Sequence, residues 1–93
     1  MHAREAVSVT ITNRLGLHAR PAMAFVELAA TFDAEVTVKR ADLDELIDGK
    51  SIMHMMMLAA TCGTEIEIVA EGADAKSAVD ALAGLVNSKF GED

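Results

Sequence analysis

The sequence predicts an α+β fold, an open-faced sandwich in which helices cover one face of a single sheet. Segments of alternating apolar and polar residues, typical of half-buried strands, are interleaved with segments whose apolar residues recur at helical spacing. Their order along the 93-residue chain is strand, helix, strand, weak strand, short helix, strand, helix. This order favours an antiparallel or mixed sheet with helices on one side. The Ser, Thr and Glu residues of the strands suit a second side that is open to water.

The first elements surround the only proline of the chain. Alternation of Val and Ile with Ser and Thr over residues 7–12 predicts a strand, and residues 13–16 follow as a turn. Apolar residues then recur at helical spacing over residues 19–30. Because a proline is tolerated in the first turn of a helix, Pro21 indicates that this helix begins at or just after His18.

The remaining elements follow the same two patterns. We expect strands over residues 35–39, 46–47 and 64–70, a short helix over 52–58 and a last helix that starts at residue 75. Charged residues around 46–47 break the alternation there, so this strand is expected to be short and at a sheet edge. Ser51 and Asp74 precede the two helices and are the expected N-caps, because their side-chain oxygens accept hydrogen bonds from free backbone N–H groups.

Length and composition indicate a small cytoplasmic protein. Ninety-three residues, 52% of them hydrophobic, suffice for one domain, residues 1–93, and not for two domains with separate cores. The single cysteine, Cys62, cannot form an intrachain disulfide, which fits a reducing compartment, and we expect it to be a small packing residue. The start of the chain lacks the apolar core of a secretion signal. The longest apolar run, residues 55–60, is far shorter than the roughly 20 residues that cross a bilayer, so we expect no membrane insertion.

A formal net charge of -7 argues against nucleic acid as a partner. Proteins that bind nucleic acids draw affinity from Lys and Arg side chains that neutralise phosphates, and the eight basic residues of this chain are scattered. Three Phe and no Trp or Tyr leave few aromatic rings for base stacking. Any chemistry therefore depends on a few polar residues.

The residues most suited to chemistry surround His18. At the start of a helix the first backbone N–H groups, here those of Ala19 and Arg20, are free, and with the helix dipole they favour an anion. The guanidinium of Arg20 suits phosphate oxygens, and Gly16 allows a tight turn ahead of the histidine. A neutral imidazole is a nucleophile at cell pH, and a phosphoramidate formed on it can pass its phosphoryl group onward. The alternative is that His18 is only an exposed or capping residue.

Residues 16–22, Gly-Leu-His-Ala-Arg-Pro-Ala, resemble the phosphorylation motif of the HPr family, the phosphocarriers of the bacterial phosphoenolpyruvate-dependent phosphotransferase system. Residues 50–56, which begin Lys-Ser-Ile-Met, are similar to the second signature of this family, and residues 62–68, residues 71–75 and the closing helix match the rest in order. The resemblance therefore covers nearly the whole chain. It implies an open-faced β-sandwich with a four-stranded, mainly antiparallel sheet and three helices on one face.

The motif match implies a phosphoryl carrier and not an enzyme. His18 matches the phosphoacceptor, which phosphorylated enzyme I modifies on Nδ1, and Arg20 matches the arginine that contacts the phosphoryl group and partner carboxylates. Downstream phosphotransferase proteins are the implied acceptors. The residues themselves also disfavour a catalyst, because they include no general base at motif spacing from His18 and no nucleotide-type Gly-rich loop. We expect no cofactor and no metal ion, and we expect a monomer because a carrier must change partners.

The short helix in the middle of the chain is apolar nearly all round, so its residues divide between the core and the surface. By the family match, Ile52, Met53 and Met56 lie on the surface that docks enzyme I and the downstream acceptors, and flexible thioether side chains fit several partners. Met55 and Leu58 are expected on the buried side.

Ser51 and His54 each allow two interpretations. Ser51 matches a serine that a dedicated kinase phosphorylates in some bacteria, and a phosphate there would place negative charge beside the docking surface. A serine at this position is equally explained as a helix N-cap, in which case no serine kinase or phosphorylase acts on it. His54 stands where the family commonly has glycine, and without a second ligand at a recognisable spacing we interpret it as a solvated helix residue and not as a metal ligand.

Other departures from the family leave the pathway open between its sugar and nitrogen branches. The segment 40–48 is longer than in typical members and lacks the usual Gly-containing hairpin turn. Residues 56–60 and the ending 89–92 look more like the nitrogen-branch paralogues. Two other functions stay open: a regulatory binding module that signals its phosphorylation state to transcription regulators or kinases, and a plain interaction domain in which His18 has no chemical role.

Overall fold

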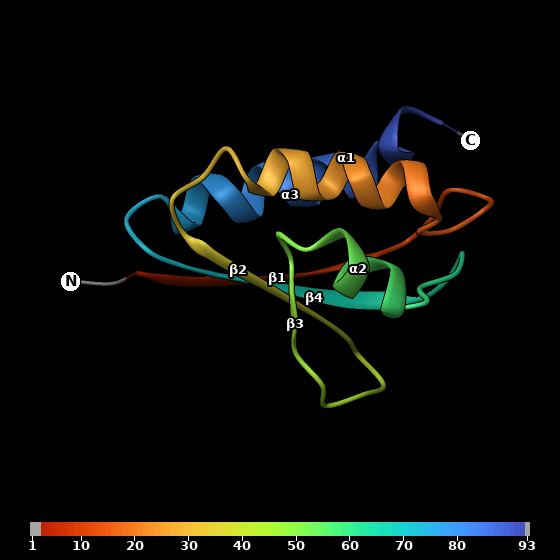
Figure 1. Cartoon of the computed structure of the whole chain (residues 1–93), viewed down its shortest axis with the longest axis horizontal. Coiled ribbons are helices and arrows are strands. Elements are labelled where there is room, and N and C mark those ends of the chain that lie inside the picture. Colours follow the sequence, from red (N-terminus) through yellow and green to blue (C-terminus); the bar gives the residue numbers. More distant parts are fainter. Residues whose placement is uncertain (1–2, 93) are drawn as a thin grey trace.

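A computed structural model describes residues 3–92, and the chain forms a four-stranded sheet covered by helices (Figure 1). The elements in chain order are β1 (Arg4–Thr10), α1 (Ala19–Ala29), β2 (Glu35–Arg40), β3 (Ile47–Asp48), α2 (Ile52–Met57), β4 (Glu65–Glu71), α3 (Ala75–Asn87) and a 3-10 turn (Lys89–Gly91). The predicted order of strands and helices is confirmed. Within the described residues, no helix is long and apolar enough to span a membrane.

The sheet is antiparallel throughout, with the strand order β1-β4-β2-β3. β4 is central, and its buried Ile66 lies opposite Val9 of β1. The neighbouring pair, Ser8 and Glu67, points to the other face, because successive side chains of a strand alternate. One face of the sheet is therefore apolar and the other polar, which confirms the predicted open-faced arrangement.

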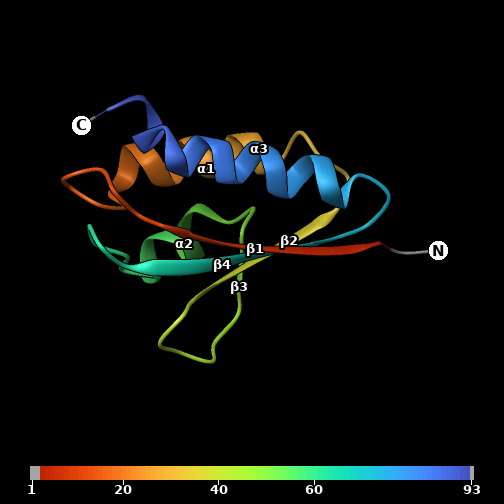
Figure 2. The ribbon, with the colours of Figure 1, turned by 180° about the vertical axis from the view of Figure 1, so that it is seen from behind.

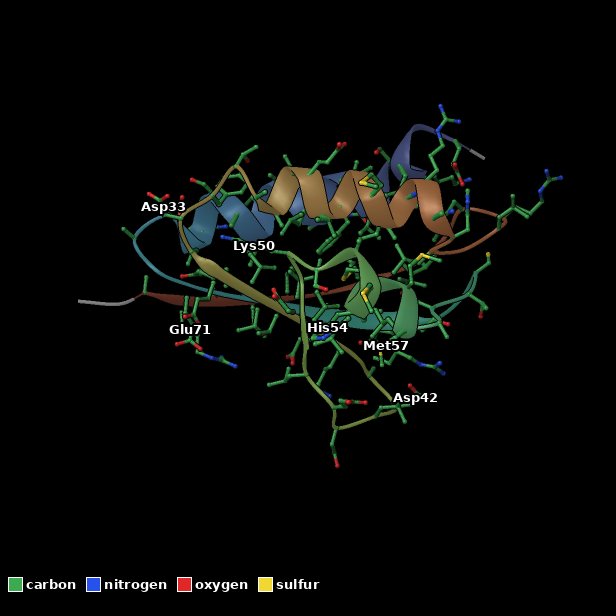
Figure 3. All side chains as sticks on the ribbon, in the orientation of Figure 1. Asp33, Asp42, Lys50, His54, Met57 and Glu71 are labelled. Atoms are coloured by element: carbon green, nitrogen blue, oxygen red, sulfur yellow. The ribbon has the colours of Figure 1, made fainter. Side chains whose placement is uncertain are left out.

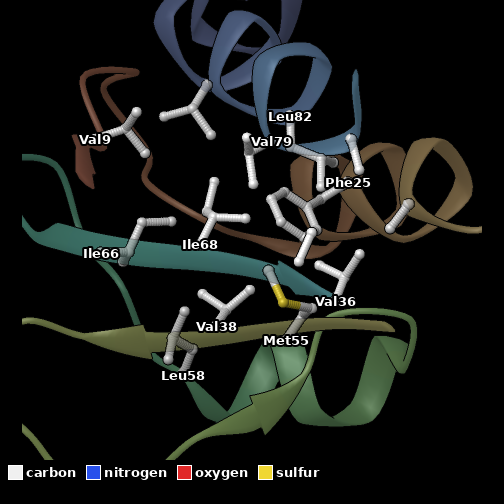
Figure 4. Close-up of a cluster of buried hydrophobic side chains, with 14 of the residues drawn as sticks. Val9, Phe25, Val36, Val38, Met55, Leu58, Ile66, Ile68, Val79 and Leu82 are labelled. Carbon is white, nitrogen blue, oxygen red and sulfur yellow. The ribbon is translucent and has the colours of Figure 1, made fainter. Parts of the chain in front are cut away.

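The helices and the apolar face of the sheet enclose one core. α1 and α3 lie side by side over the sheet (Figures 1 and 2), and α2 contacts both α1 and β3. Every layer contributes fully buried side chains, among them Phe25, Val38, Met55, Ile68 and Leu82 (Figure 4). Burial of a large apolar side chain stabilises a fold by roughly 1.5–3 kcal/mol. The buried positions of Met55 and Leu58 confirm the predicted inner side of α2.

The weak strand exists as the two-residue edge strand β3, which pairs with Thr37 and Val38. The loop that precedes it extends away from the sheet on the side opposite α1 and α3 (Figures 1 and 2), and its Leu43 and Leu46 are exposed. Polar contacts at the end of β2 hold the start of this loop: Arg40 forms an ion pair with Asp42 at 2.9 Å. The strand is short because exposed and charged residues offer little apolar surface to bury.

Two expectations from the sequence need correction. Cys62 is exposed and does not pack in the core, since it lies in the turn that precedes β4. Asp74 occupies the N-cap position of α3, but its side chain makes no capping bond to that helix. Its two carboxylate oxygens accept hydrogen bonds from the backbone N–H groups of Asp33 and Ala34, at 2.9 and 2.8 Å, and so tie the start of α3 to the loop before β2.

Candidate functional site

His18 is the N-cap residue of α1, with an extended backbone (φ -78°, ψ -173°) and a side chain that is 35% exposed. Its carbonyl oxygen accepts the first helical hydrogen bond, from the N–H of Ala22 at 3.0 Å. Pro21 has no N–H, and the amides of Ala19 and Arg20 make no hydrogen bond to any residue between 3 and 92. The helix entrance therefore presents the two free amides that the sequence predicts.

A tight loop holds the histidine at this entrance. Gly16 has a φ of +72°, which residues with a side chain adopt at a cost. A Cβ atom at this position would lie 2.7 Å from the carbonyl oxygen of Ala60. That same oxygen accepts a hydrogen bond from the N–H of Leu17 at 2.8 Å, one residue before His18. The close approach of the two backbones therefore requires glycine and fixes the position of the His18 backbone.

The His18 ring contacts the far end of the chain, which sequence reasoning missed. Its Nε2 lies 2.8 Å from Oε1 of Glu92, a residue 74 positions away, whose side chain is 22% exposed. The end of the chain, in blue, and the loop that leads into α1, in orange, lie at the same end of the molecule in both opposed views (Figures 1 and 2). The one signal that the sequence offers for this segment is the likeness of residues 89–92 to nitrogen-branch proteins, and that likeness does not predict a contact with His18.

Asn13 completes this junction from the loop before α1. It is the one buried polar or charged side chain among residues 3–92, and its Nδ2 donates to the Gly16 carbonyl at 2.6 Å and to Glu92 Oε1 at 3.0 Å. Because both partners are acceptors, the amide nitrogen must face them. Its Oδ1 is buried with no hydrogen-bond partner among the described residues, an arrangement that costs free energy and is rare in folded proteins.

Glu92 is held in its ionised form. The hydrogen bond from His18 lowers the pKa of the Glu92 carboxyl below its ordinary value. Partial burial acts in the opposite direction, whereas the hydrogen bond from Asn13 and the positive charge of Arg20 lower the pKa further. Near neutral pH the group facing the His18 ring is therefore a carboxylate, which only accepts hydrogen bonds.

This contact assigns separate roles to the two ring nitrogens of His18. Since the Glu92 carboxylate has no proton to give, the hydrogen in the contact must be on Nε2. In a neutral imidazole the other nitrogen, Nδ1, then carries the free electron pair. Nδ1 makes no hydrogen bond to any of the described residues. The ring thus presents a nucleophilic nitrogen on the side away from Glu92.

Arg20 lies at the same entrance with an exposed side chain. It forms no ion pair with the described residues, and its charge nevertheless influences Glu92 across the site. The exposed Arg14 precedes the histidine on the loop. The site therefore combines a nucleophilic nitrogen, two amides without a hydrogen bond among the described residues and an exposed cation, a set that suits a transiently attached anion.

The residues predicted for docking lie on α2, and the structure divides them. Met53 and Met56 are exposed, whereas Ile52 is partly buried and packs against the core. Met57 of α2 (Figure 3) and Met23 of α1 are further exposed large apolar side chains. Because α1 contacts α2, this apolar surface belongs to the same two helices that carry His18 and Ser51 at their N-caps.

Ser51 caps α2 as the sequence predicts. Its Oγ accepts a hydrogen bond from the backbone N–H of His54 at 3.2 Å. The His54 side chain is exposed (Figure 3), and its Nδ1 accepts a hydrogen bond from the N–H of Asp48 at 3.2 Å. His54 therefore links α2 to the end of β3 in addition to facing solvent.

Comparisons with known proteins show the family and the fold of the chain. A family model described as "PTS HPr component phosphorylation site" matches residues 2–88. The phosphocarrier protein HPr of Pseudomonas putida is 50% identical over 92 residues, which cover 99% of this chain and 98% of that protein. The phosphocarrier protein NPr of Escherichia coli K12 is 42% identical over 86 residues, 92% of this chain and 94% of that protein. The crystal structure of HPr-C-His from Thermoanaerobacter tengcongensis is similar at a TM-score of 0.89 and 39% identity, with 96% and 98% of the two chains covered.

Proposed function

Because the chain belongs to the HPr family of phosphocarrier proteins, we propose that it carries a phosphoryl group on Nδ1 of His18. Phosphorylated enzyme I of the phosphotransferase system donates the group, and downstream phosphotransferase proteins receive it. The observation that carries this proposal is the placement of His18 at the mouth of α1, with Nδ1 free and the amides of Ala19 and Arg20 unbonded within residues 3–92. The protein is a carrier that partner enzymes phosphorylate, and not a catalyst.

The proposed transfer is a displacement between two nitrogens. The electron pair on Nδ1 of His18 attacks the phosphorus of a phosphohistidine on the donor, and a new N–P bond forms. The old N–P bond breaks, and its electron pair returns to the imidazole of the donor. The phosphoryl oxygens carry the negative charge throughout, and the free backbone N–H groups of Ala19 and Arg20 and the Arg20 guanidinium are donors available to these oxygens.

The exposed residues of α2 support the docking part of the proposal. Met53 and Met56 offer apolar surface that a partner can cover, and Ile52 contributes at its partly buried edge. Such an interface must be small and short-lived, because a carrier releases one partner before it engages the next. We propose that the protein works in this way as a cytoplasmic monomer.

Phosphorylation by enzyme I tests the proposal. The pure protein is incubated with enzyme I and phosphoenolpyruvate, and its intact mass is measured beside the variants His18→Ala and His54→Ala. We expect the native chain and His54→Ala to gain one phosphoryl group and His18→Ala to gain none. A native chain that gains no mass, or a His18→Ala variant that does, contradicts the assignment of His18.

Ser51 regulation stays a separate prediction. The Ser51 hydroxyl is engaged as the cap of α2, which accounts for the residue without a kinase. Its position at the edge of the exposed methionines would still let a phosphate repel an acidic partner. Incubation with a serine kinase of this system and ATP, followed by mapping of the modified residue, distinguishes the two interpretations.

A further inference from the structure

We propose that Glu92 is a positioning residue for the transfer: its carboxylate holds the proton on Nε2 of His18 and stabilises the positive charge that the ring gains when Nδ1 attacks phosphorus. This inference rests on the proposed carrier function and adds to it a residue near the end of the chain. Glu92 lies beyond the residues 2–88 that the family model matches. Its contacts with His18 and Asn13 support this role.

The carboxylate is held from two sides. Oε1 of Glu92 accepts from Nε2 of His18 at 2.8 Å and from Nδ2 of Asn13 at 3.0 Å. Asn13 is itself buried and donates to the Gly16 carbonyl, so it connects Glu92 to the loop that places the histidine. A carboxylate oxygen that accepts two hydrogen bonds in such a network leaves its side chain little freedom to rotate. The His18 ring is therefore oriented by a group that the fold keeps in place.

The backbone before Glu92 is bent to bring it there. Lys89, Phe90 and Gly91 all have positive φ values, of 60°, 56° and 75°. Two of these three residues carry a Cβ, which makes the left-handed conformation costly. Phe90 packs against the core and the N–H of Glu92 bonds to the Lys89 carbonyl at 3.0 Å, so packing and hydrogen bonds hold the turn. Backbone held in costly conformations often marks a functional position.

The chemistry explains what the carboxylate would contribute. When the electron pair of Nδ1 forms the bond to phosphorus, the ring becomes positively charged and the hydrogen on Nε2 becomes more acidic. A carboxylate 2.8 Å from Nε2 stabilises that charge without taking the proton, as the aspartate of a Ser-His-Asp triad does for its histidine. The electron pair of the broken bond goes to the donor imidazole, so atoms and charge balance. Because Nε2 and Nδ1 point away from each other, Glu92 leaves the phosphoryl side of the ring open.

The same contact acts in both directions of transfer. A group that stabilises the charged ring in the transition state lowers the barrier for accepting the phosphoryl group and for passing it on. The pKa of Glu92 is lowered, first by the hydrogen bond from His18, which favours the ionised carboxylate that this role requires. We therefore expect Glu92 to affect the rates of transfer and the state of the free ring together.

Two measurements on one set of variants test the inference. The nitrogen-15 signals of the His18 ring report which nitrogen carries the proton, and the initial rate of phosphorylation by enzyme I reports the transfer. The variants are Glu92→Ala, which removes the acceptor, Glu92→Gln, which keeps an acceptor oxygen without the charge, and Glu71→Gln. Glu71 is an exposed acid at the opposite end of the molecule (Figure 3), so its variant controls for the lost charge.

We expect the native protein and Glu71→Gln to show an unprotonated Nδ1 and equal rates. Glu92→Ala should move the Nδ1 signal toward the average of two exchanging tautomers. It should also lower the phosphorylation rate by about 3- to 10-fold. This loss is smaller than the loss expected for a fully buried charged hydrogen bond, because Glu92 is partly solvated. Glu92→Gln should keep the native ring signal and show an intermediate rate. Unchanged backbone amide signals away from residues 13–20 verify that the variants are folded.

The outcomes separate this inference from the proposed function. If the native chain is not phosphorylated at all, the carrier function itself is wrong. If the native chain is phosphorylated and Glu92→Ala has the native ring signal and the native rate, only the role of Glu92 is overturned. A slower Glu92→Ala variant with a native ring signal also overturns it, because Glu92 would then act on the partner and not through His18.

Discussion

At the scale of single residues, the site depends on how the two nitrogens of one imidazole are divided. Nε2 of His18 is hydrogen-bonded to Glu92, whereas Nδ1 and the amides of Ala19 and Arg20 have no hydrogen bond among the described residues. Asn13 connects this pair to the loop in front of the helix. Within residues 3–92, Nδ1 of His18 and the amides of Ala19 and Arg20 are left unbonded, and these are the groups that a carrier needs for a transiently attached anion.

The backbone conformation of Gly16 is the feature on which the position of His18 depends most directly. Replacement by alanine places a Cβ in the left-handed conformation and 2.7 Å from the Ala60 carbonyl oxygen, a backbone atom that cannot turn aside. We expect Gly16→Ala to lower the free energy of unfolding by about 2–5 kcal/mol, from the backbone conformation and the overlap together. Urea unfolding followed by circular dichroism measures the change.

Gly63→Ala is the matched control, because Gly63 also has a positive φ, of 95°, but no atom lies within 4 Å of its Cβ position. This variant should lose only the conformational part, about 1–2 kcal/mol. Equal losses for the two glycines would mean that the close approach of Gly16 to Ala60 has no energetic consequence.

At the scale of elements, the helices and strands that are encoded by patterns of neighbouring residues were predicted well. Alternation identified β1, β2 and β4, and Pro21 placed the start of α1 because its ring restricts the local backbone. The two-residue β3 was the least regular, since its pairing with β2 depends on a partner strand and not on its own sequence. Local patterns report local geometry, so they locate elements better than the contacts between them.

The side chain of Asp74 shows where that limit lies. Its N-cap position was predicted, but its carboxylate bonds to Asp33 and Ala34, 41 and 40 residues away, and not to α3. An N-cap residue adopts extended or irregular backbone whichever amide its side chain finds. Nothing in the sequence near Asp74 indicates that the loop before β2 lies within reach.

Asp74 also gives a prediction about pH. The hydrogen bond from the Asp33 amide, with that from Ala34, lowers the pKa of Asp74 below the ordinary value of 3.8, while partial burial opposes the shift. A carboxyl whose pKa is lower in the folded state adds stability above its unfolded pKa and loses that contribution as the pH falls through its folded pKa. We therefore expect Asp74→Ala to be less stable than the native protein at pH 7 and to approach its stability as the pH falls below 3.8 and through the lowered pKa of the folded state.

Urea unfolding midpoints measured from pH 7 down to acid provide the comparison. Asp80→Ala is the control, because among residues 3–92 Asp80 pairs only with Lys76 on the exposed surface of α3 and such pairs contribute little. A difference between Asp74→Ala and the native protein that does not change with pH would show that the carboxylate charge is not what the two amides stabilise.

At the scale of the whole molecule, the fold brings the end of the chain to the start of its first helix. The fold class, the family and the place of His18 at the start of α1 were accessible from the sequence, since they depend on periodicity and on contiguous motifs. The contacts of Glu92 with His18 and Asn13 span 74 and 79 residues. No local pattern encodes such a contact, because it depends on the lengths and packing of α3 and of the turn that follows.

The most direct test of the account is to identify the ring nitrogen that bonds to phosphorus. The protein, labelled with nitrogen-15 in its histidines, is phosphorylated by enzyme I and phosphoenolpyruvate and studied by phosphorus and nitrogen NMR. Because Glu92 occupies Nε2, we predict one phosphohistidine, at His18, with phosphorus coupled to Nδ1 and hydrogen retained on Nε2. A bond from phosphorus to Nε2, or a phosphoryl group on any residue other than His18, would contradict the account.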